Sequence, residues 1–174
     1  EQIVRNTRVE NCTIRNVGVE FEDSVGIFAG YTQSTVIEGN EIYNLPYSGI
    51  SIGWGWGEED AGGSTYPIPF VYESPTPARD NRVANNHIHH VMQKRQDGGG
   101  VYTLGNQSGT IVEGNHIHDN PGIPGGIYLD EGSGFIEVRN NRVYNVHTPM
   151  NFNNRNQNRI DTCNVHDNEF EEKK

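Results

Sequence analysis

The chain has 174 residues, a formal net charge of −10 and a pI near 5.1, and 33% of its residues are hydrophobic. This length fits one domain, and the acidic charge is the opposite of the basic surface that nucleic-acid binding requires. The sequence has no apolar run of about 18 residues, which excludes a membrane-spanning helix. We therefore expect a single domain over residues 1–174 that binds neither nucleic acid nor a membrane.

The elements predicted along the chain repeat with a period of about 27 residues. An apolar residue stands two places after an Asn, or after a Cys in the first copy, at Ile14, Ile42, Ile88, Ile117, Val143 and Phe170. The intervals between these positions are 28, 46, 29, 26 and 27 residues. The long interval contains an insertion from Gly55 to about Pro77 that is rich in Gly, Pro and aromatic residues. Long loops on a rigid repeat scaffold are often functional, although a packed flap over Trp54 and Trp56 is an equal alternative.

Each repeat contains three short segments in which apolar residues alternate with polar ones, which predicts three short strands. We expect strands like Gly100–Gly105, Thr110–Glu113 and His116–His118 in every repeat. Three strands per repeat of this length predict an all-β fold, a right-handed parallel β-helix of about six coils with one long loop insertion. One Asn per coil should stack on the next at a corner and adopt a left-handed backbone there, at Asn40, Asn86, Asn115, Asn141 and Asn168.

The two ends of the chain carry weaker signals. Cys12 and Cys163 fall about five coils apart, roughly 20 Å or more, which is too far for a disulfide. The sequence enters the first coil almost at once, carries no signal peptide and ends in EFEEKK. These features indicate an excerpt, an unusually short relative or an engineered solenoid, either monomeric or paired through uncapped solenoid ends.

The first strand of each coil presents an outward face of aromatic, amide and carboxylate side chains. Such a face suits sugar rings and hydroxyl groups, so we expect a polysaccharide or an oligosaccharide as the ligand. An ordinary solvated face with aromatic ladders is the alternative. The residues that we expect to bind the sugar here are Trp54, Trp56, Tyr102, Tyr128, Asn153 and Arg155.

Three carboxyl groups near this face are candidates for acid–base chemistry: Asp97, Asp130 and Glu131. Glycosidases commonly use one carboxyl group as an acid and a second as a base or nucleophile. Asp97 and Asp130 form the best pair, but about seven residues separate their aligned positions, up to ~20 Å in an extended chain. Asp97 could instead be a turn former before Gly98, and Glu131 a solvated strand end.

Four histidines flank the inward Ile88 and Ile117 and should form an outward patch: His87, His89, His116 and His118. Neutral imidazoles at this spacing could hold zinc or copper, but a flat sheet rarely provides tetrahedral convergence. We therefore assign neither a metal nor a cofactor. His89 and His118 are instead expected to border the sugar cleft and to relay protons.

Several phrases resemble a known family: YSGISIGWGWG, DGGGVYTLGNQSGTIVEGNHIH, GGIYLDEGSGFIEVRNNRVYNV and NFNNRNQN. They resemble the β-helix domain of glycoside hydrolase family 141 and its relatives, over about Tyr47 to Asn158. The resemblance implies a secreted or periplasmic carbohydrate-active hydrolase with two catalytic aspartates. The positions that match are Asp97 in DGGG and Asp130 in YLDEG. Full enzymes of that kind are several times longer than this chain.

Three functional hypotheses remain open at this point. The first is a glycoside hydrolase of a plant or microbial polysaccharide. The second is a polysaccharide lyase, for which Lys94, Arg95 and Arg155 are the available cations. The third is a truncated or engineered β-helix scaffold without activity.

Overall fold

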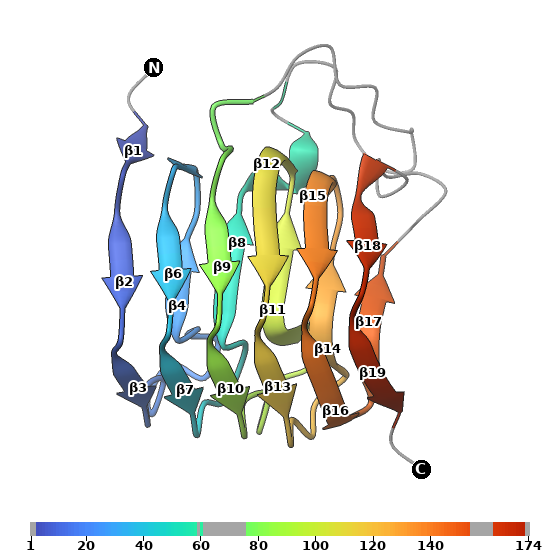
Figure 1. The fold of residues 1–174 in the computed structure, drawn as a ribbon. Helices are drawn as coiled ribbons and strands as arrows, with labels where there is room; N and C mark the ends of the chain where they lie inside the picture. Colours follow the sequence, from blue (N-terminus) through green and yellow to red (C-terminus); the bar gives the residue numbers. More distant parts are fainter. Residues whose placement is uncertain (1–2, 59, 61–75, 154–161, 173–174) are drawn as a thin grey trace.

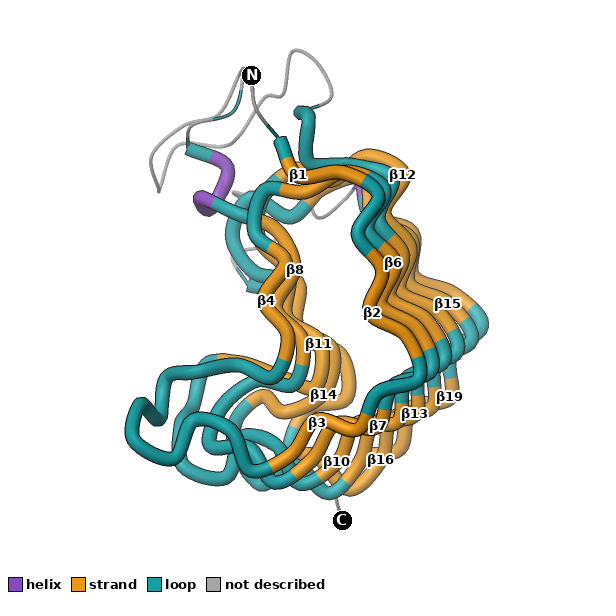
Figure 2. Tube along the Cα trace, turned by 90° about the vertical axis from the view of Figure 1, so that its left-hand side faces the viewer, coloured by secondary structure: helices purple, strands orange, loops and turns teal. Residues whose placement is uncertain are grey.

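The computed structural model describes residues 3–58, 60, 76–153 and 162–172. The chain winds into a right-handed parallel β-helix, which confirms the predicted fold class (Figure 1). Successive coils stack along one axis, so that equivalent strands lie side by side (Figure 2). No helix among the described residues has the length and apolar character needed to cross a membrane.

Three parallel sheets form the walls of the solenoid. Sheet one contains β4 (Ile27–Ala29), β8 (Ile50–Gly53), β11 (Gly98–Leu104), β14 (Pro124–Leu129) and β17 (Thr148–Phe152). Sheet two contains β2 (Arg8–Glu10), β6 (Val36–Glu38), β9 (Arg82–Ala84), β12 (Asn106–Glu113), β15 (Gly134–Arg139) and β18 (Asn164–His166). Sheet three contains β3 (Thr13–Arg15), β7 (Glu41–Tyr43), β10 (His87–His89), β13 (His116–His118), β16 (Arg142–Val146) and β19 (Glu169–Glu172). A short additional sheet pairs β1 (Val4–Arg5) with β5 (Thr32–Gln33).

The core consists of the inward residues of the three sheets, stacked in register. In sheet three, Ile42, Ile88 and Ile117 are aligned partners and are fully buried. Sheets one and two supply equivalent ladders, which also follow the predicted positions: Ile27, Ile50, Val101, Ile127 and Met150, and Val9, Ile37, Val83, Val112, Val138 and Val165. Stacking one apolar side chain on the next removes it from water without a thick core, so a sequence with few hydrophobic residues can fold.

The corner between sheets two and three is held by hydrogen bonds between stacked asparagines. The Nδ2 of Asn86 donates to Oδ1 of Asn115 at 3.0 Å, and the Nδ2 of Asn115 donates to Oδ1 of Asn141 at 2.9 Å. The expected left-handed backbone does not occur at these asparagines but one residue earlier, at Gly39, Asn85, Gly114, Asn140 and Asp167. The left-handed residue makes the turn, and the asparagine after it directs its amide toward the next coil.

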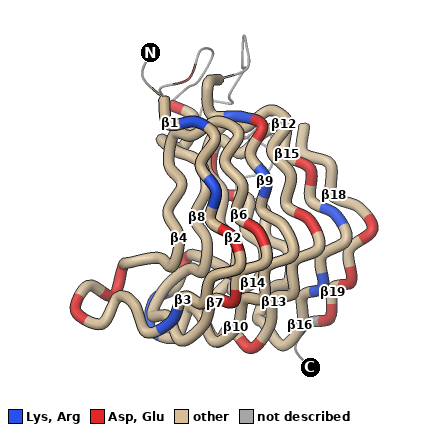
Figure 3. The backbone as a smooth tube through the Cα atoms, turned by 60° about the vertical axis from the view of Figure 1, so that its left-hand side comes forward, with Lys and Arg blue, Asp and Glu red and all other residues tan. Residues whose placement is uncertain are grey.

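The outer face of sheet two carries a chain of ion pairs that crosses several coils. Arg82 contacts Glu38 at 2.7 Å and Glu113 at 2.8 Å, and Arg139 contacts Glu113 and Glu137 at 2.9 Å each. Figure 3 shows red acidic and blue basic segments along the strands of this sheet. Exposed pairs contribute little individually, so their main effect is to favour this register over others.

The predicted insertion leaves sheet one after β8. Its described part includes η1 (Gly55–Gly57), a single 3₁₀ turn, and Asp60. Residues 59 and 61–75, most of the insertion, lie outside the described residues. The structure also extends the first strand of this coil, because β11 begins at Gly98 rather than at the expected Gly100.

Candidate active site

Asp130 lies directly after β14 and is held by residues from the coils on both sides. The hydroxyl of Tyr102, one coil earlier, donates to its Oδ2, and Nδ2 of Asn153, one coil later, donates to its Oδ1 at 2.6 Å. The residue is only 4% exposed. A buried carboxylate needs hydrogen-bond donors to offset its lost hydration, and the two neighbouring coils supply them.

Asp97 lies at the opposite end of sheet one, just before β11, and is exposed. Its backbone has a φ of 63°, and its N–H donates to the carbonyl of Ile123 at 2.7 Å. Its own carbonyl accepts a hydrogen bond from the Tyr47 hydroxyl at 2.7 Å. These contacts fix the position of the Asp97 main chain, from which its carboxylate extends.

Tyr128 joins the two aspartates. Its hydroxyl donates to Oδ1 of Asp97 at 3.1 Å and is also within hydrogen-bonding reach of Asp130. Both carboxyl groups therefore lie beside the Tyr128 hydroxyl, although the aligned positions of Asp97 and Asp130 would be up to ~20 Å apart in an extended chain. We call Tyr47, Asp97, Tyr102, Tyr128, Asp130 and Asn153 the carboxylate–tyrosine cluster.

The start of the first strand is closely packed. Sheet one curves between the loops that precede it and η1, which follows it (Figure 2). Main chains approach closely at the start of these strands: a Cβ on Gly99 would lie 2.3 Å from the oxygen of Gly126, and a Cβ on Gly100 would lie 2.5 Å from Cγ2 of Ile117. Only glycine fits at these two positions, because a side chain at either one would clash with the neighbouring coil or the core.

The tyrosines of the cluster remain protonated donors. Burial, followed by the charges of Asp130 and Asp97, raises the pKa of the Tyr128 hydroxyl. Burial and the charge of Asp130 likewise raise the pKa of Tyr102, and burial and the charge of Asp97 raise the pKa of Tyr47. Each hydroxyl therefore stays protonated and donates a hydrogen bond to a carboxylate or a carbonyl oxygen.

The aromatic residues expected to bind sugar divide into two groups. Tyr102 and Tyr128 are 9% and 4% exposed, and their rings pack edge to face at 5.2 Å. This burial corrects their expected role as a stacking platform, because their hydroxyls hold the carboxylates instead. Trp54 and Trp56 are 55% and 51% exposed, and the ring of Trp54 packs edge to face against Phe28 at 6.1 Å. A Cβ on Gly132 would lie 2.3 Å from the carbonyl oxygen of Trp56, so η1 packs on the turn that follows Asp130.

The remaining predicted residues lie in different places. Glu131 is half-buried beside Asp130, and its carbonyl accepts a hydrogen bond from the N–H of Gly105 at 3.1 Å. Arg155 lies outside the described residues. His89 and His118 belong to sheet three, whereas the aspartates lie at the two ends of strands in sheet one. Sequence reasoning missed Tyr47, which no periodic signal distinguishes from other loop aromatics.

The four histidines form the predicted outward patch on β10 and β13. One ligand nitrogen of each of His87, His116 and His118 lies within 4.8 Å of the other two, and His87, His89 and Glu41 form a second such group. Burial, followed by the charges of neighbouring histidines, lowers the pKa of His87, His89 and His116. The described residues that could hold a metal in this way are therefore all on sheet three.

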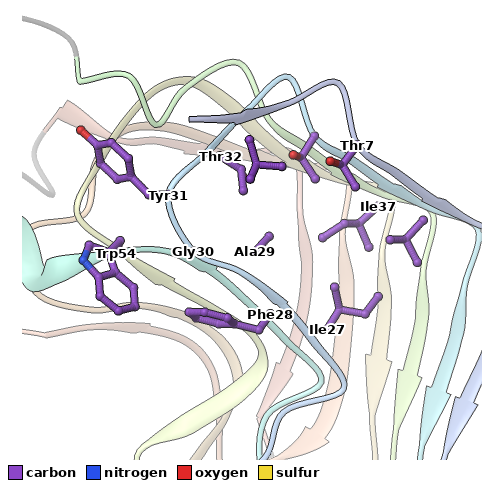
Figure 4. A pocket seen from close by; sticks show the side chains of 12 residues that line it. Thr7, Ile27, Phe28, Ala29, Gly30, Tyr31, Thr32, Ile37 and Trp54 are labelled. Atoms are coloured by element: carbon purple, nitrogen blue, oxygen red, sulfur yellow. The ribbon is translucent and has the colours of Figure 1, made fainter. Parts of the chain in front are cut away.

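A separate hollow of about 460 Å³ opens at the N-terminal end of the described core. Figure 4 shows that Ile27, Ala29 and Ile37 line it, and that Phe28 and Trp54 stand at one side. Its lining is mostly apolar and includes neither Asp97 nor Asp130. It is the end of the core and is distinct from the carboxylate–tyrosine cluster.

Comparisons with known proteins agree with this fold. A family described as "right handed beta helix region" matches residues 69–171. A solved structure named "Glycoside hydrolase" is 29% identical in sequence and superposes with a TM-score of 0.71. The match covers 96% of this chain and 26% of that structure, so the chain spans about a quarter of its length. None of the curated proteins matches the chain.

Proposed function

The chain belongs to the right-handed β-helix family, and on that premise we propose that it is a carbohydrate-active protein that hydrolyses glycosidic bonds at its carboxylate–tyrosine cluster. The observation that carries the proposal is the placement of Asp97 and Asp130 on either side of the Tyr128 hydroxyl. Glycosidases hold their two catalytic carboxyl groups roughly 5–10 Å apart, and two carboxyl groups beside one hydroxyl are compatible with that requirement.

Asp97 and Asp130 divide the roles of general acid and of base or nucleophile. The exposed Asp97 can meet water and substrate directly, while Asp130 is fixed by Tyr102 and Asn153. Tyr128 orients Asp97, because its protonated hydroxyl donates to Oδ1 of that residue. A sugar entering from the Asp97 side would meet a preorganised pair, which is the condition for efficient acid–base catalysis.

The exposed Trp54 and Trp56 provide the apolar contacts that a sugar ring requires. Trp54 directly precedes η1, and Trp56 belongs to it. Trp56 also packs on the turn after Asp130. The similarity to a structure named as a glycoside hydrolase, at 29% identity, supports the same class of ligand. The ligand that we propose is therefore a plant or microbial polysaccharide, or an oligosaccharide derived from one.

Two contacts favour hydrolysis over a lyase reaction. A lyase needs a free basic side chain to remove a proton from a uronate. Lys94 pairs with Glu22 at 2.6 Å, and Arg95 pairs with Asp23 at 2.9 Å. These two cations are thus engaged by carboxylates of an earlier coil.

The decisive experiment compares three Asp→Asn variants on a broad panel of polysaccharides, with release of reducing ends as the measurement. Asp130→Asn and Asp97→Asn should each lower turnover by about 10²–10⁴-fold, since each removes one proton-transfer group. Asp167→Asn is the matched control, because Asp167 is exposed and left-handed, a backbone that asparagine also tolerates.

The outcomes separate the hypotheses. Full turnover in Asp130→Asn would refute the assigned pair. A rise in absorbance near 235 nm on uronate polymers would indicate a lyase instead. A wild-type chain that melts cooperatively but hydrolyses none of the panel would identify an inactive scaffold.

A further inference from the structure

The patch on sheet three has a feature that simple stacking does not explain. In the parallel register His87 is the partner of His116, and His89 is the partner of His118. His87 and His118 are therefore diagonal neighbours, whose Cβ atoms are typically up to about 7–8 Å apart. Their Nε2 atoms nevertheless lie 2.8 Å from each other. The two rings are tilted by 34°, so His87 leans across the strand toward the next coil.

This distance is that of an N–H···N hydrogen bond between the two rings, and it is slightly shorter than the spacing of two ligands of one metal ion. Two imidazole nitrogens that bind the same ion at about 2.0–2.1 Å are roughly 2.9–3.4 Å apart when they occupy adjacent positions. The His87–His118 pair needs only a small movement to reach that geometry. A nitrogen of His116 lies within 4.8 Å of both, so a ring rotation can supply a third ligand.

The surroundings of His118 fix the tautomer that a ligand requires. Its Nδ1 is 2.7 Å from Oδ2 of Asp119, and Asp119 is itself held by Nδ2 of Asn145. A metal-ligating histidine usually gives its other ring proton to such a carboxylate. With the proton on Nδ1, the lone pair of Nε2 points at His87.

Neighbouring rings restrict the imidazoles further. Tyr144 stacks on His118 at 4.9 Å with an interplanar angle of 4°, and Tyr43 stacks on His89 at 5.0 Å and 6°. An oxygen of Glu41 lies 3.8 Å from a ring nitrogen of His87 and of His89. Glu41 and Asp119 add negative charge beside the patch, which favours a cation.

We propose that His87, His116 and His118 form a binding site for a divalent transition-metal ion of the Zn²⁺ or Cu²⁺ type. Imidazole is a preferred ligand of both ions, and three histidines leave a fourth position open to water or to another ligand. The site lies on sheet three and does not depend on the function proposed for the aspartates of sheet one.

The test is metal binding by the untagged chain after treatment with a chelator. Calorimetric titration with Cu²⁺, and competition with a chromophoric chelator for Zn²⁺, should each give one ion per chain with a dissociation constant of about 10 µM or tighter. Mg²⁺ should not bind, because it prefers oxygen ligands. Nitrogen couplings from several imidazoles should be visible in the electron paramagnetic resonance spectrum of the Cu²⁺ form.

His118→Gln should weaken binding by at least about 100-fold, and Asp119→Asn by about 10–100-fold through loss of the carboxylate behind the ligand. His147→Gln is the matched control, because His147 is an exposed histidine whose Nδ1 contacts Thr148 outside the patch. Circular dichroism of each variant establishes that the fold is intact. Less than one-tenth of an ion per chain, unchanged binding in folded His118→Gln, or an equal loss in His147→Gln would overturn the proposal.

Discussion

The asparagine ladder allows a direct test of what holds the coils together. Asn115 is buried and makes four side-chain hydrogen bonds: it accepts from the N–H and Nδ2 of Asn86 and donates to Val83 and Asn141. Asn168 also makes four, with the N–H and Nδ2 of Asn141 and the carbonyls of Val138 and His166. The two residues differ mainly in burial, because Asn168 is partly open to water.

The loss expected for Asn115→Ala follows from these contacts. At about 1 kcal/mol net for each hydrogen bond, the free energy of unfolding should fall by about 4 kcal/mol. Water cannot replace the amide in a buried corner, so the abandoned groups stay unsatisfied. For Asn168→Ala, water can take over part of the bonding, and we expect a loss of about 1–2 kcal/mol. The first loss corresponds to a decrease in melting temperature of about 8–16 °C for a chain of this size.

Urea unfolding followed by far-ultraviolet circular dichroism measures both losses in one experiment. The free energy of unfolding of Asn115→Ala should fall at least about 2 kcal/mol further than that of Asn168→Ala. Equal losses in the two variants would refute the reasoning, because they would show that burial does not determine how much a ladder asparagine contributes to the free energy of unfolding. A loss below about 0.5 kcal/mol in both would show that backbone stacking alone holds the corner.

Two further predictions concern buried or half-buried carboxyl groups. Tyr102→Phe should lower the free energy of unfolding of the parent by about 1.5–3 kcal/mol, because it removes a hydrogen bond to a charged carboxylate. In the Asp130→Asn background the same substitution should cost clearly less, because the hydrogen-bond acceptor there is a neutral amide. A double-mutant cycle by urea unfolding that shows no coupling would contradict the buried Tyr102–Asp130 contact. Burial raises the pKa of Asp60 from 3.8 to about 6, so its folded state retains a proton that the unfolded state has lost. The free energy of unfolding of the parent should therefore fall as pH rises from 3.8 through about 6. Asp60→Asn lacks this carboxyl, so its free energy of unfolding should rise relative to that of the parent over this pH range, and the difference should stay constant above it. A stability difference that does not change between pH 4 and 7 would show that this carboxyl is not buried.

The fold was predictable because every coil repeats the same pattern of inward apolar residues in its own sequence. Ile88 and Ile117 are flanked by the same residues and follow an asparagine by the same number of places, so their register follows from the sequence. The left-handed residue was misplaced by one position for a comparable reason. Asn85 and Asn86 are adjacent and of the same type, and residue type alone does not show which one turns the chain.

The candidate site was less predictable, because it depends on geometry that no single residue encodes. The identity of Asp97 and Asp130 as candidates came from the sequence, but their common neighbour Tyr128 became visible only in the structure. Tyr128 was expected to bind the sugar from the outward face, but it is buried and its ring packs against the neighbouring Tyr102. Position along a strand is readable from sequence, whereas curvature and side-chain burial arise from the stacked coils.

One diagonal contact nevertheless occurs in both polar clusters, and it could have been read from the sequence. Tyr102 is the register partner of Tyr128, and it bonds Asp130, two residues beyond that partner. His87 is the register partner of His116, and it contacts His118, also two residues beyond. Residues two apart lie on the same face of a strand, so an outward residue meets its partner and the next outward residue of the adjacent coil. In a solenoid of known period, functional pairs should therefore be sought at a spacing of one repeat plus two residues, a diagonal that a search for direct ladder partners overlooks.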